Sequence, residues 1–178
     1  MLSRRNFLAV SAAATASALI ARPAQAALHT KIERTIHLHN IHTGEHLRTV
    51  YWHDGKYQPQ AMRQINKLLR DHYNNSVHSM DPHVVDLLSS LQHRIGGHKP
   101  LQIISGYRSP QTNAMLASLT DGVAQHSLHM EGKAVDIRIE GMTVRNLGRA
   151  AKSMRAGGVG MYPSSNFVHV DVGKVRYW

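Results

Sequence analysis

The stretch SLHMEGKAVDIR, at residues 127–138, combines a glycine turn with an alternating strand. His129 and Asp136 lie seven residues apart with Gly132 between them. That spacing suits a loop that turns back into a strand, and it does not suit one helix face, where neighbours are about three or four residues apart. Successive side chains of a strand point to opposite faces, so Asp136 faces away from the apolar residues beside it. We therefore expect His129 and Asp136 to meet on one face of a sheet.

A second stretch, FVHVD at residues 167–171, adds a third polar side chain. Alternation places His169 and Asp171 on one face and the two valines on the core face. Two imidazoles and one carboxylate form a ligand set typical of a catalytic zinc ion, which keeps its fourth position for water. We predict that His129, Asp136 and His169 bind one Zn²⁺ ion. Taken singly, each also has a structural interpretation, as a hydrogen-bonded histidine or an aspartate paired with an arginine.

The composition limits the ligands that a metal could have. The chain contains no cysteine, which excludes thiolate ligands and disulfide bonds, and it contains 14 histidines. Most of these histidines lack a motif, and we expect surface roles for them. His126 is intermediate, because it lies three residues before His129 and could contact the metal site or a substrate.

The first 26 residues are typical of an export signal. Paired arginines, Arg4 and Arg5, precede an apolar run over residues 9–20, and AQA at residues 24–26 is a small-x-small cleavage site. The run is shorter than the roughly 20 apolar residues that span a bilayer. Paired arginines followed by Phe-Leu resemble a twin-arginine signal, and an ordinary secretory signal is the alternative. We expect twin-arginine export to the periplasm, with residues 27–34 as a short leader.

The charge balance predicts an anionic partner. The formal net charge is +10, and the export signal contains three of the 21 basic residues and none of the 11 acidic ones, so the rest of the chain keeps +7. A nucleic-acid platform would interleave aromatic residues with these charges, and we expect no such partner because that pattern is missing. An anionic wall polymer fits better, with solubility as the alternative role of the charge. We expect a monomer that does not insert into the membrane after signal removal.

About 152 residues remain after the signal, enough for one domain with a hydrophobic core. The patterning predicts an α+β fold, with helices packed on a small antiparallel sheet that carries the zinc site, over residues 35–178. The expected strands are a hairpin over residues 35–52 and single strands over 101–104, 134–139, 167–172 and 175–178, with another after a tight turn at residues 157–160. The expected helices cover residues 58–72, 81–95, 109–119 and 143–156.

The motifs resemble those of known zinc peptidases. Ser-x-His-x-x-Gly-x-Ala-x-Asp with a downstream histidine is similar to the signature of zinc D-alanyl-D-alanine carboxypeptidases and VanX-like dipeptidases. SGYRS at residues 105–109, GGVGMY at 157–162 and FVHVDVG at 167–173 resemble the MepK-like branch of murein endopeptidases. The resemblance covers residues 35–178 and implies a hedgehog/D-Ala-D-Ala peptidase-like fold. It also implies the same three zinc ligands.

Carried over by position, the resemblance implies that Arg108 polarises the scissile carbonyl or holds the oxyanion. A fixed guanidinium aimed at developing negative charge stabilises a tetrahedral state, and the alternative for Arg108 is an ion pair with Asp136 or Asp171. Ser127, Tyr107 and His126 are candidate substrate contacts. For Tyr107 the alternative is packing in the core.

The chain departs from many relatives at the position of the general base. Those relatives place an acidic residue three positions before the last ligand or a histidine two before it, where this chain has Asn166 and Phe167. Asp171 is the first candidate for the base and Glu131 the second. Asp171 could equally orient His169 without taking a proton.

These observations predict a zinc metallopeptidase that hydrolyses an amide bond in peptidoglycan stem peptides. The resemblance favours an endopeptidase acting on peptide cross-links, for example between diaminopimelate residues. The alternatives are a zinc D,D- or L,D-carboxypeptidase or dipeptidase on stem peptides, and an inactive zinc-stabilised module that binds the cell wall. The missing acidic residue at position 166 motivates the last alternative.

Overall fold

The computed structural model describes residues 33–119 and 124–178, and these residues belong to one compact unit. The expected export signal, residues 1–26, and most of the expected leader lie outside the described residues. No helix in the described ranges combines the length and the hydrophobicity that crossing a membrane requires.

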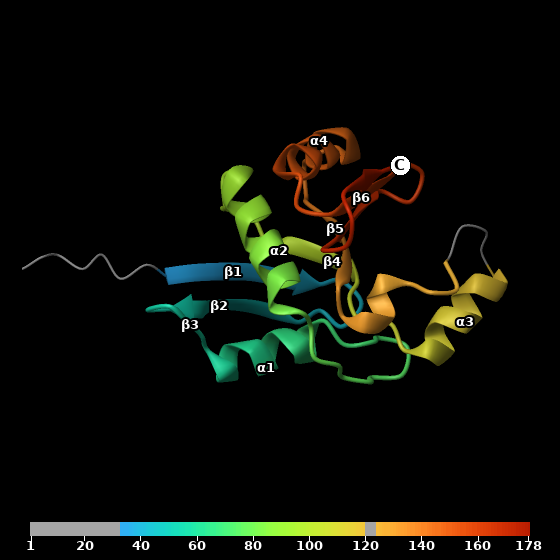
Figure 1. Cartoon of the computed structure of the whole chain (residues 1–178), viewed down its shortest axis with the longest axis horizontal. Coiled ribbons are helices and arrows are strands. Elements are labelled where there is room, and N and C mark those ends of the chain that lie inside the picture. Colours follow the sequence, from blue (N-terminus) through green and yellow to red (C-terminus); the bar gives the residue numbers. More distant parts are fainter. Residues whose placement is uncertain (1–32, 120–123) are drawn as a thin grey trace, which may run out of the picture. The chain divides into compact units, whose positions relative to one another are not determined.

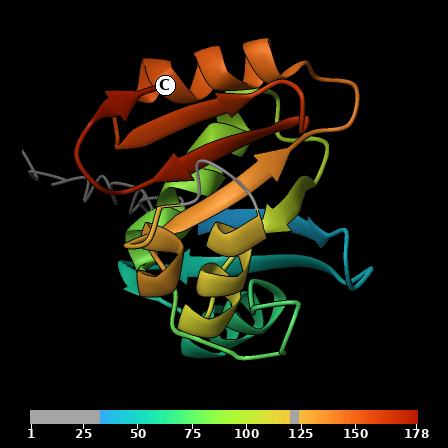
Figure 2. The same cartoon turned by 90° about the vertical axis from the view of Figure 1, so that its right-hand side faces the viewer.

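Eight strands form one sheet in the order β3-β2-β1-β4-β5-β7-β6-β8 (Figures 1 and 2). The strands are β1 (Glu33–Asn40), β2 (His46–His53), β3 (Lys56–Tyr57), β4 (Leu101–Ser105), β5 (Ala134–Arg138), β6 (Gly158–Tyr162), β7 (Phe167–Asp171) and β8 (Arg176–Tyr177). The predicted α+β class is confirmed. The sheet is larger than expected and mixed, because β1 pairs with β4 and β6 pairs with β8 in parallel, while the other pairs are antiparallel.

The parallel pair in the middle of the sheet follows from the chain's path. Parallel neighbours need a crossover connection, usually through a helix. Between β3 and β4 the chain forms α1 (Pro59–Leu68) and α2 (Pro82–Arg94) before it returns beside β1. Asp81 caps α2 by accepting a hydrogen bond from the backbone N–H of His83 at 2.9 Å, and Pro82 begins the helix, as its sequence predicts.

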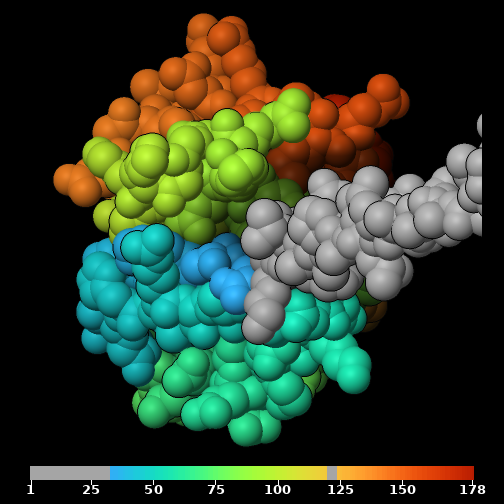
Figure 3. All heavy atoms as spheres, turned by 90° about the vertical axis from the view of Figure 1, so that its left-hand side faces the viewer, coloured from blue at the N-terminus to red at the C-terminus, as the bar shows by residue number. Residues whose placement is uncertain are grey.

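The helices lie on both sides of the sheet. α1, α2 and α4 (Val144–Met154) pack on one face, and α3 (Pro110–Leu119) lies on the other with the short 3₁₀ helix η1 (Leu128–Glu131) (Figures 1 and 2). Viewed from the side of α1, α2 and α4, α2 lies between α4 and the hairpin of β1 and β2 (Figure 3). The hydrophobic core therefore lies between α1, α2, α4 and the sheet.

Alternation in the central strands separates the core from the opposite face. Val135 and Ile137 of β5 and Val168 and Val170 of β7 are fully buried and belong to the core. Burying such a side chain stabilises the fold by about 1.5–3 kcal/mol. Because neighbouring residues of a strand point to opposite faces, burial of these four side chains fixes the polar residues between them on the face that carries η1.

Candidate metal centre

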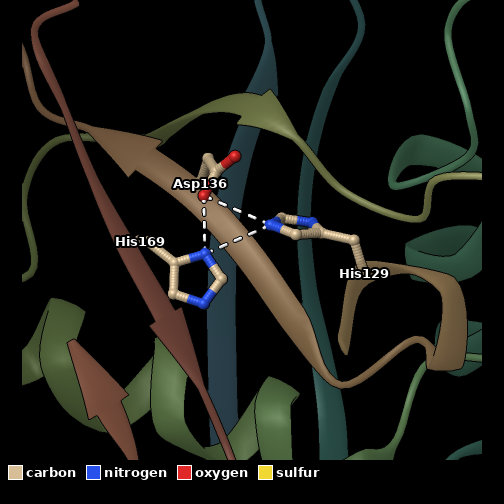
Figure 4. A group of neighbouring side chains, drawn as sticks. All are labelled: His129, Asp136 and His169. Atoms are coloured by element: carbon tan, nitrogen blue, oxygen red, sulfur yellow. Dashed lines mark hydrogen bonds and ion pairs between the residues drawn. The ribbon is translucent and has the colours of Figure 1, made fainter. Parts of the chain in front are cut away.

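Three side chains converge on one point above β5 and β7 (Figure 4). Asp136 Oδ1 lies 2.9 Å from His169 Nδ1 and 3.3 Å from His129 Nε2, and the two ring nitrogens are 3.2 Å apart. Ligand atoms at the corners of a tetrahedron around zinc, with bonds of about 2.0–2.1 Å, lie about 3.3 Å from one another. The triangle therefore has the dimensions of one face of a zinc coordination tetrahedron.

Strand register and a glycine turn bring these residues together. Asp136 on β5 is directly opposite His169 on β7. His129 comes from η1, which ends at Gly132 with a φ of 67°. A Cβ at Gly132 would lie 2.6 Å from the carbonyl oxygen of Ser79, so both the backbone conformation and the available space require glycine there. The left-handed conformation of Gly132, packed against the backbone of Ser79, lets the chain turn at the end of η1 and enter β5.

Hydrogen bonds on the far side of each ring direct its lone pair toward the common point. His129 Nδ1 donates to the carbonyl oxygen of Gly106 at 2.7 Å, and His169 Nε2 donates to Asp171 Oδ2 at 3.0 Å. A carbonyl oxygen only accepts, so the proton of His129 is on Nδ1 and its Nε2 is free to bind a metal. This is the arrangement in which outer partners fix the tautomer of metal-binding histidines.

The electrostatics of the three residues favour a bound cation. Burial raises the pKa of Asp136, but the charges and hydrogen bonds of His129 and His169 outweigh it and hold that pKa well below its usual range. Burial lowers the pKa of His169, but hydrogen bonds with Asp136 and Asp171 outweigh it and raise the pKa to about 9. The cluster holds a proton in the absence of metal, and a metal ion would replace that proton.

Asp171 lies behind His169, away from the point where the three ligand atoms meet. Its side chain is fully buried, and Oδ1 accepts backbone hydrogen bonds from Gly158 at 3.0 Å and Gly173 at 2.8 Å. Arg176 donates to both carboxylate oxygens, at 3.1 and 2.7 Å. This position disagrees with the expectation of a general base, because the carboxylate contacts the ring nitrogen opposite the metal-facing one. It matches the alternative in which Asp171 orients His169.

Arg108 lies beside the other oxygen of the metal-site carboxylate. Its Nη2 is 3.4 Å from Asp136 Oδ2, and its Nε is buried without a hydrogen-bond partner among the described residues. Both features agree with a guanidinium at the site. The contact with Asp136 is also the ion pair that the sequence analysis gave as the alternative role of Arg108. The loop that carries Arg108 is anchored by the buried Asp71, which accepts from the backbone N–H of Ser109 at 2.9 Å. Sequence reasoning did not identify Asp71.

The remaining candidates belong to the two loops that carry His129 and Arg108. Ser127 caps η1 by accepting from the backbone N–H of His129 at 3.3 Å, and Tyr107 stacks on His78 with ring centroids 4.6 Å apart. His126 is exposed, and Glu131 is exposed and accepts from Lys133 at 2.7 Å. A hydrogen bond or stacking contact thus gives Ser127 and Tyr107 a structural role in addition to any contact with substrate.

Two further residues contribute that the sequence patterns did not single out as site residues. Arg176 binds Asp171, and the ring of Trp178 lies 5.4 Å from the ring of His169. Both belong to the C-terminal segment Arg176-Tyr177-Trp178, to which the sequence analysis assigned no role. In the sequence, only the presence of aromatic and basic residues near the end of a strand indicated a role for this segment, and that pattern does not predict which residues they contact.

Two imidazoles with fixed tautomers and a carboxylate, beside a half-buried arginine in an α+β fold, could hold one metal ion of the kind that hydrolases use. The family model described as "Peptidoglycan L,D-endopeptidase MepK" matches residues 28–178. The chain belongs to this family of metallopeptidases.

Curated relatives agree over nearly the whole length. "Peptidoglycan L,D-endopeptidase MepK" of Escherichia coli (strain K12) is 43% identical over 176 residues, which cover 99% of this chain and 97% of the relative. "Probable peptidoglycan L,D-endopeptidase MepK" of Haemophilus influenzae is 36% identical over 177 residues, with 99% and 95% covered. The resemblance seen in the sequence motifs is confirmed.

Proposed function

We propose that the chain is a zinc-dependent peptidoglycan hydrolase, an endopeptidase that cleaves peptide cross-links between stem peptides. The observation that carries the proposal is the triangle of His129, Asp136 and His169, whose dimensions and tautomers suit one metal ion. Family membership and the names of the relatives, which specify an L,D-endopeptidase, support the substrate class and the bond.

The donor set favours zinc over other ions. Nitrogen and oxygen ligands in a tetrahedral arrangement are typical of catalytic zinc, which acidifies a bound water and polarises a carbonyl. His129, Asp136 and His169 would hold the ion. Asp171 would keep the His169 ring in place, because it is itself fixed by four hydrogen bonds from Gly158, Gly173 and Arg176.

Arg108 is assigned to stabilise negative charge on the scissile carbonyl oxygen. Its buried Nε lacks a partner in the described part of the chain, and its other contacts, to Ser105, Asn113 and Asp136, are 3.3–3.4 Å long. Long hydrogen bonds in the free state leave the guanidinium able to turn toward a substrate. Because Asp171 contacts the far side of His169, we keep Glu131, two residues after His129 in the ligand loop, as the proposed proton acceptor, and it would have to release Lys133 to act.

The substrate class also sets where the protein would act. We infer that residues 1–26 direct export to the periplasm by the twin-arginine route. Of the expected leader over residues 27–34, Glu33 and Arg34 belong to β1, so the peptidase domain expected over residues 35–178 would begin at Glu33. The basic charge supports contact with the anionic cell wall, and such binding weakens as salt screens it.

The test is incubation of the zinc-loaded protein with isolated peptidoglycan, followed by mass spectrometry of the muropeptides. An endopeptidase converts cross-linked dimers to monomers, whereas a carboxypeptidase shortens monomers without removing dimers. Arg108→Gln is expected to keep zinc and lose about 10²–10³-fold in kcat. Unchanged muropeptides with one zinc bound per chain would overturn the hydrolase proposal in favour of the inactive wall-binding module.

A further inference from the structure

Arg138 lies on the same face of β5 as Asp136, one pleat further along the strand. Side chains two residues apart in a strand share a face and are separated by about 6.6–6.8 Å. Arg138 is half-buried. The sheet face with the metal centre therefore carries a second permanent cation, which the reaction described above does not use.

A neighbouring glutamine holds this arginine in place. Gln102 of β4 is directly opposite Arg138, and Arg138 Nε donates to Gln102 Oε1 at 2.7 Å. Within residues 33–119 and 124–178 this is the single side-chain hydrogen bond of Arg138, and no carboxylate lies within 4.0 Å of it. The two terminal nitrogens of the guanidinium remain available, and such a fork binds carboxylates with two parallel hydrogen bonds.

The arginine opens into a pocket large enough for part of a peptide. The pocket has a volume of about 570 Å³ and is lined by Gln102, Arg138, Asn166 and the segment 139–143 that follows β5. Small-molecule sites commonly have volumes of about 300–1,000 Å³. Glu140 is the acidic residue of the lining, and it forms no ion pair with Arg138 in the described part of the chain.

The residues on the other side of Gln102 supply no competing negative charge. His39 of β1 is opposite both Gln102 and His46 of β2, and the two histidine rings stack with centroids 3.8 Å apart. Burial lowers the pKa of His39, and the positive charges of His46 and Arg138 lower it further. A row of neutral and basic side chains thus leads from Arg138 across the sheet.

We propose that Arg138, oriented by Gln102, binds a carboxylate of the peptide substrate two or three residues from the scissile bond. The spacing follows from geometry, because an extended peptide advances about 3.3–3.6 Å per residue and the arginine lies one pleat from the metal ligand. The inference rests on the proposed function, since it assigns the pocket to a peptide whose scissile bond lies at the metal centre. It makes Arg138 a specificity residue and Gln102 a positioning residue.

The test uses two peptides that differ only at that carboxylate, which is free in one and a carboxamide in the other. Their binding to the zinc-loaded protein is measured by titration calorimetry, and their hydrolysis as kcat/KM. The wild type is expected to favour the free carboxylate roughly 10- to 100-fold, the effect of a charge-assisted hydrogen-bond pair. Arg138→Gln removes this preference, and Arg138→Lys, which keeps the charge without the fork, retains part of it.

Control variants separate a local role from a general effect of charge. Arg48→Gln removes an exposed cation of β2 on the same sheet face and keeps the preference. Gln102→Ala keeps the guanidinium but reduces the preference, while thermal unfolding shows whether the fold is intact. Preference retained by Arg138→Gln, or none in the wild type, would overturn the inference. Equal hydrolysis of both peptides would support the proposed function and contradict the role of Arg138. Selective binding of the free carboxylate without hydrolysis would support the role of Arg138 and contradict the proposed function.

Discussion

Two carboxylates of this fold, Asp86 on α2 and Asp136 on β5, each contact three polar side chains, and the two clusters differ in what their partners supply. Asp86 accepts hydrogen bonds from Arg34 and Tyr51 at 2.8 Å and from Tyr57 at 2.6 Å. All three partners donate protons, so the cluster is complete without any other component.

At Asp136, by contrast, two of the partners are imidazoles, and each turns toward the carboxylate a ring nitrogen that can either carry a proton or present a lone pair. One proton of each histidine is held on the outer side of its ring by a hydrogen bond, so the inner side is left with acceptors that share a single further proton. A ring of acceptors is stable only around a proton or a metal ion. The comparison teaches that the direction of the donors, and not the number of polar contacts, distinguishes a structural cluster from a binding site.

The largest effect is expected from removing one acceptor of the metal cluster. His129→Ala should abolish stoichiometric zinc binding and lower kcat/KM by more than roughly 10³-fold, since the metal supplies the acidified water. Metal content by mass spectrometry and muropeptide release measure the two effects. His39→Ala is the matched control, because His39 is half-buried on the same sheet face without touching the cluster. Full zinc occupancy in His129→Ala would contradict the assignment of ligands.

The second effect tests the residue behind the ligand. Asp171→Asn keeps the size of the side chain but weakens the hydrogen bond to His169, and zinc affinity should fall about 10- to 100-fold. Competition with a chelator of known affinity measures the change. If affinity is unchanged and kcat alone is lost, Asp171 acts as the general base and the positioning role is wrong.

A smaller effect is expected in the cluster around Asp86, where all partners donate hydrogen bonds. In the wild type, the hydrogen bond to Asp86 and, to a smaller extent, burial raise the pKa of Tyr57 to about 12. Tyr57→Phe removes this hydrogen bond. The free energy of unfolding should fall by about 1–2 kcal/mol. Denaturant titration measures this loss, and zinc content and activity should remain at the wild-type level. A change in zinc content would mean that the two clusters are not independent.

The smallest effect concerns pH. Burial raises the pKa of Asp86, but hydrogen bonds from Tyr57, Arg34 and Tyr51 outweigh it and lower the pKa below its usual value. The stabilisation is present above the unfolded pKa of about 3.9 and is lost as pH falls through the folded value. The difference in Tm between wild type and Asp86→Asn should therefore be constant from pH 7 to 5 and shrink below about pH 4. A difference that persists at pH 2 would show that packing, not charge, sets it.

Local patterns predicted which three side chains converge, and long-range packing determined the contacts that the sequence did not reveal. Alternation in β5 and β7 and the turn at Gly132 depend on neighbouring residues, so they were visible in the sequence. The parallel pairing of β1 with β4 depends on how α1 and α2 pack, and no local pattern encodes it. The helix expected over residues 58–72 ends at Leu68, where the chain turns so that Asp71 can anchor the loop of Arg108.

The partners of the site residues were equally hidden. Arg176 reaches Asp171 only because the turn after β7 returns the chain to the sheet edge. Gly106 accepts from His129 through a backbone carbonyl, which any residue type could supply. Such contacts depend on tertiary geometry, and residue identity gives no signal for them.

The pairing of Asp136 with His169 also bears on how β7 finds its place. Slipping this strand by one residue would expose its two core valines, so the apolar pattern rejects odd shifts. A slip of two residues would keep the valines buried and satisfy the core, yet it would move the ligands apart by about 6.6–6.8 Å. Metal binding would reject these even shifts. A bound ion would thus favour one strand alignment among those that hydrophobic burial alone leaves nearly equivalent in free energy.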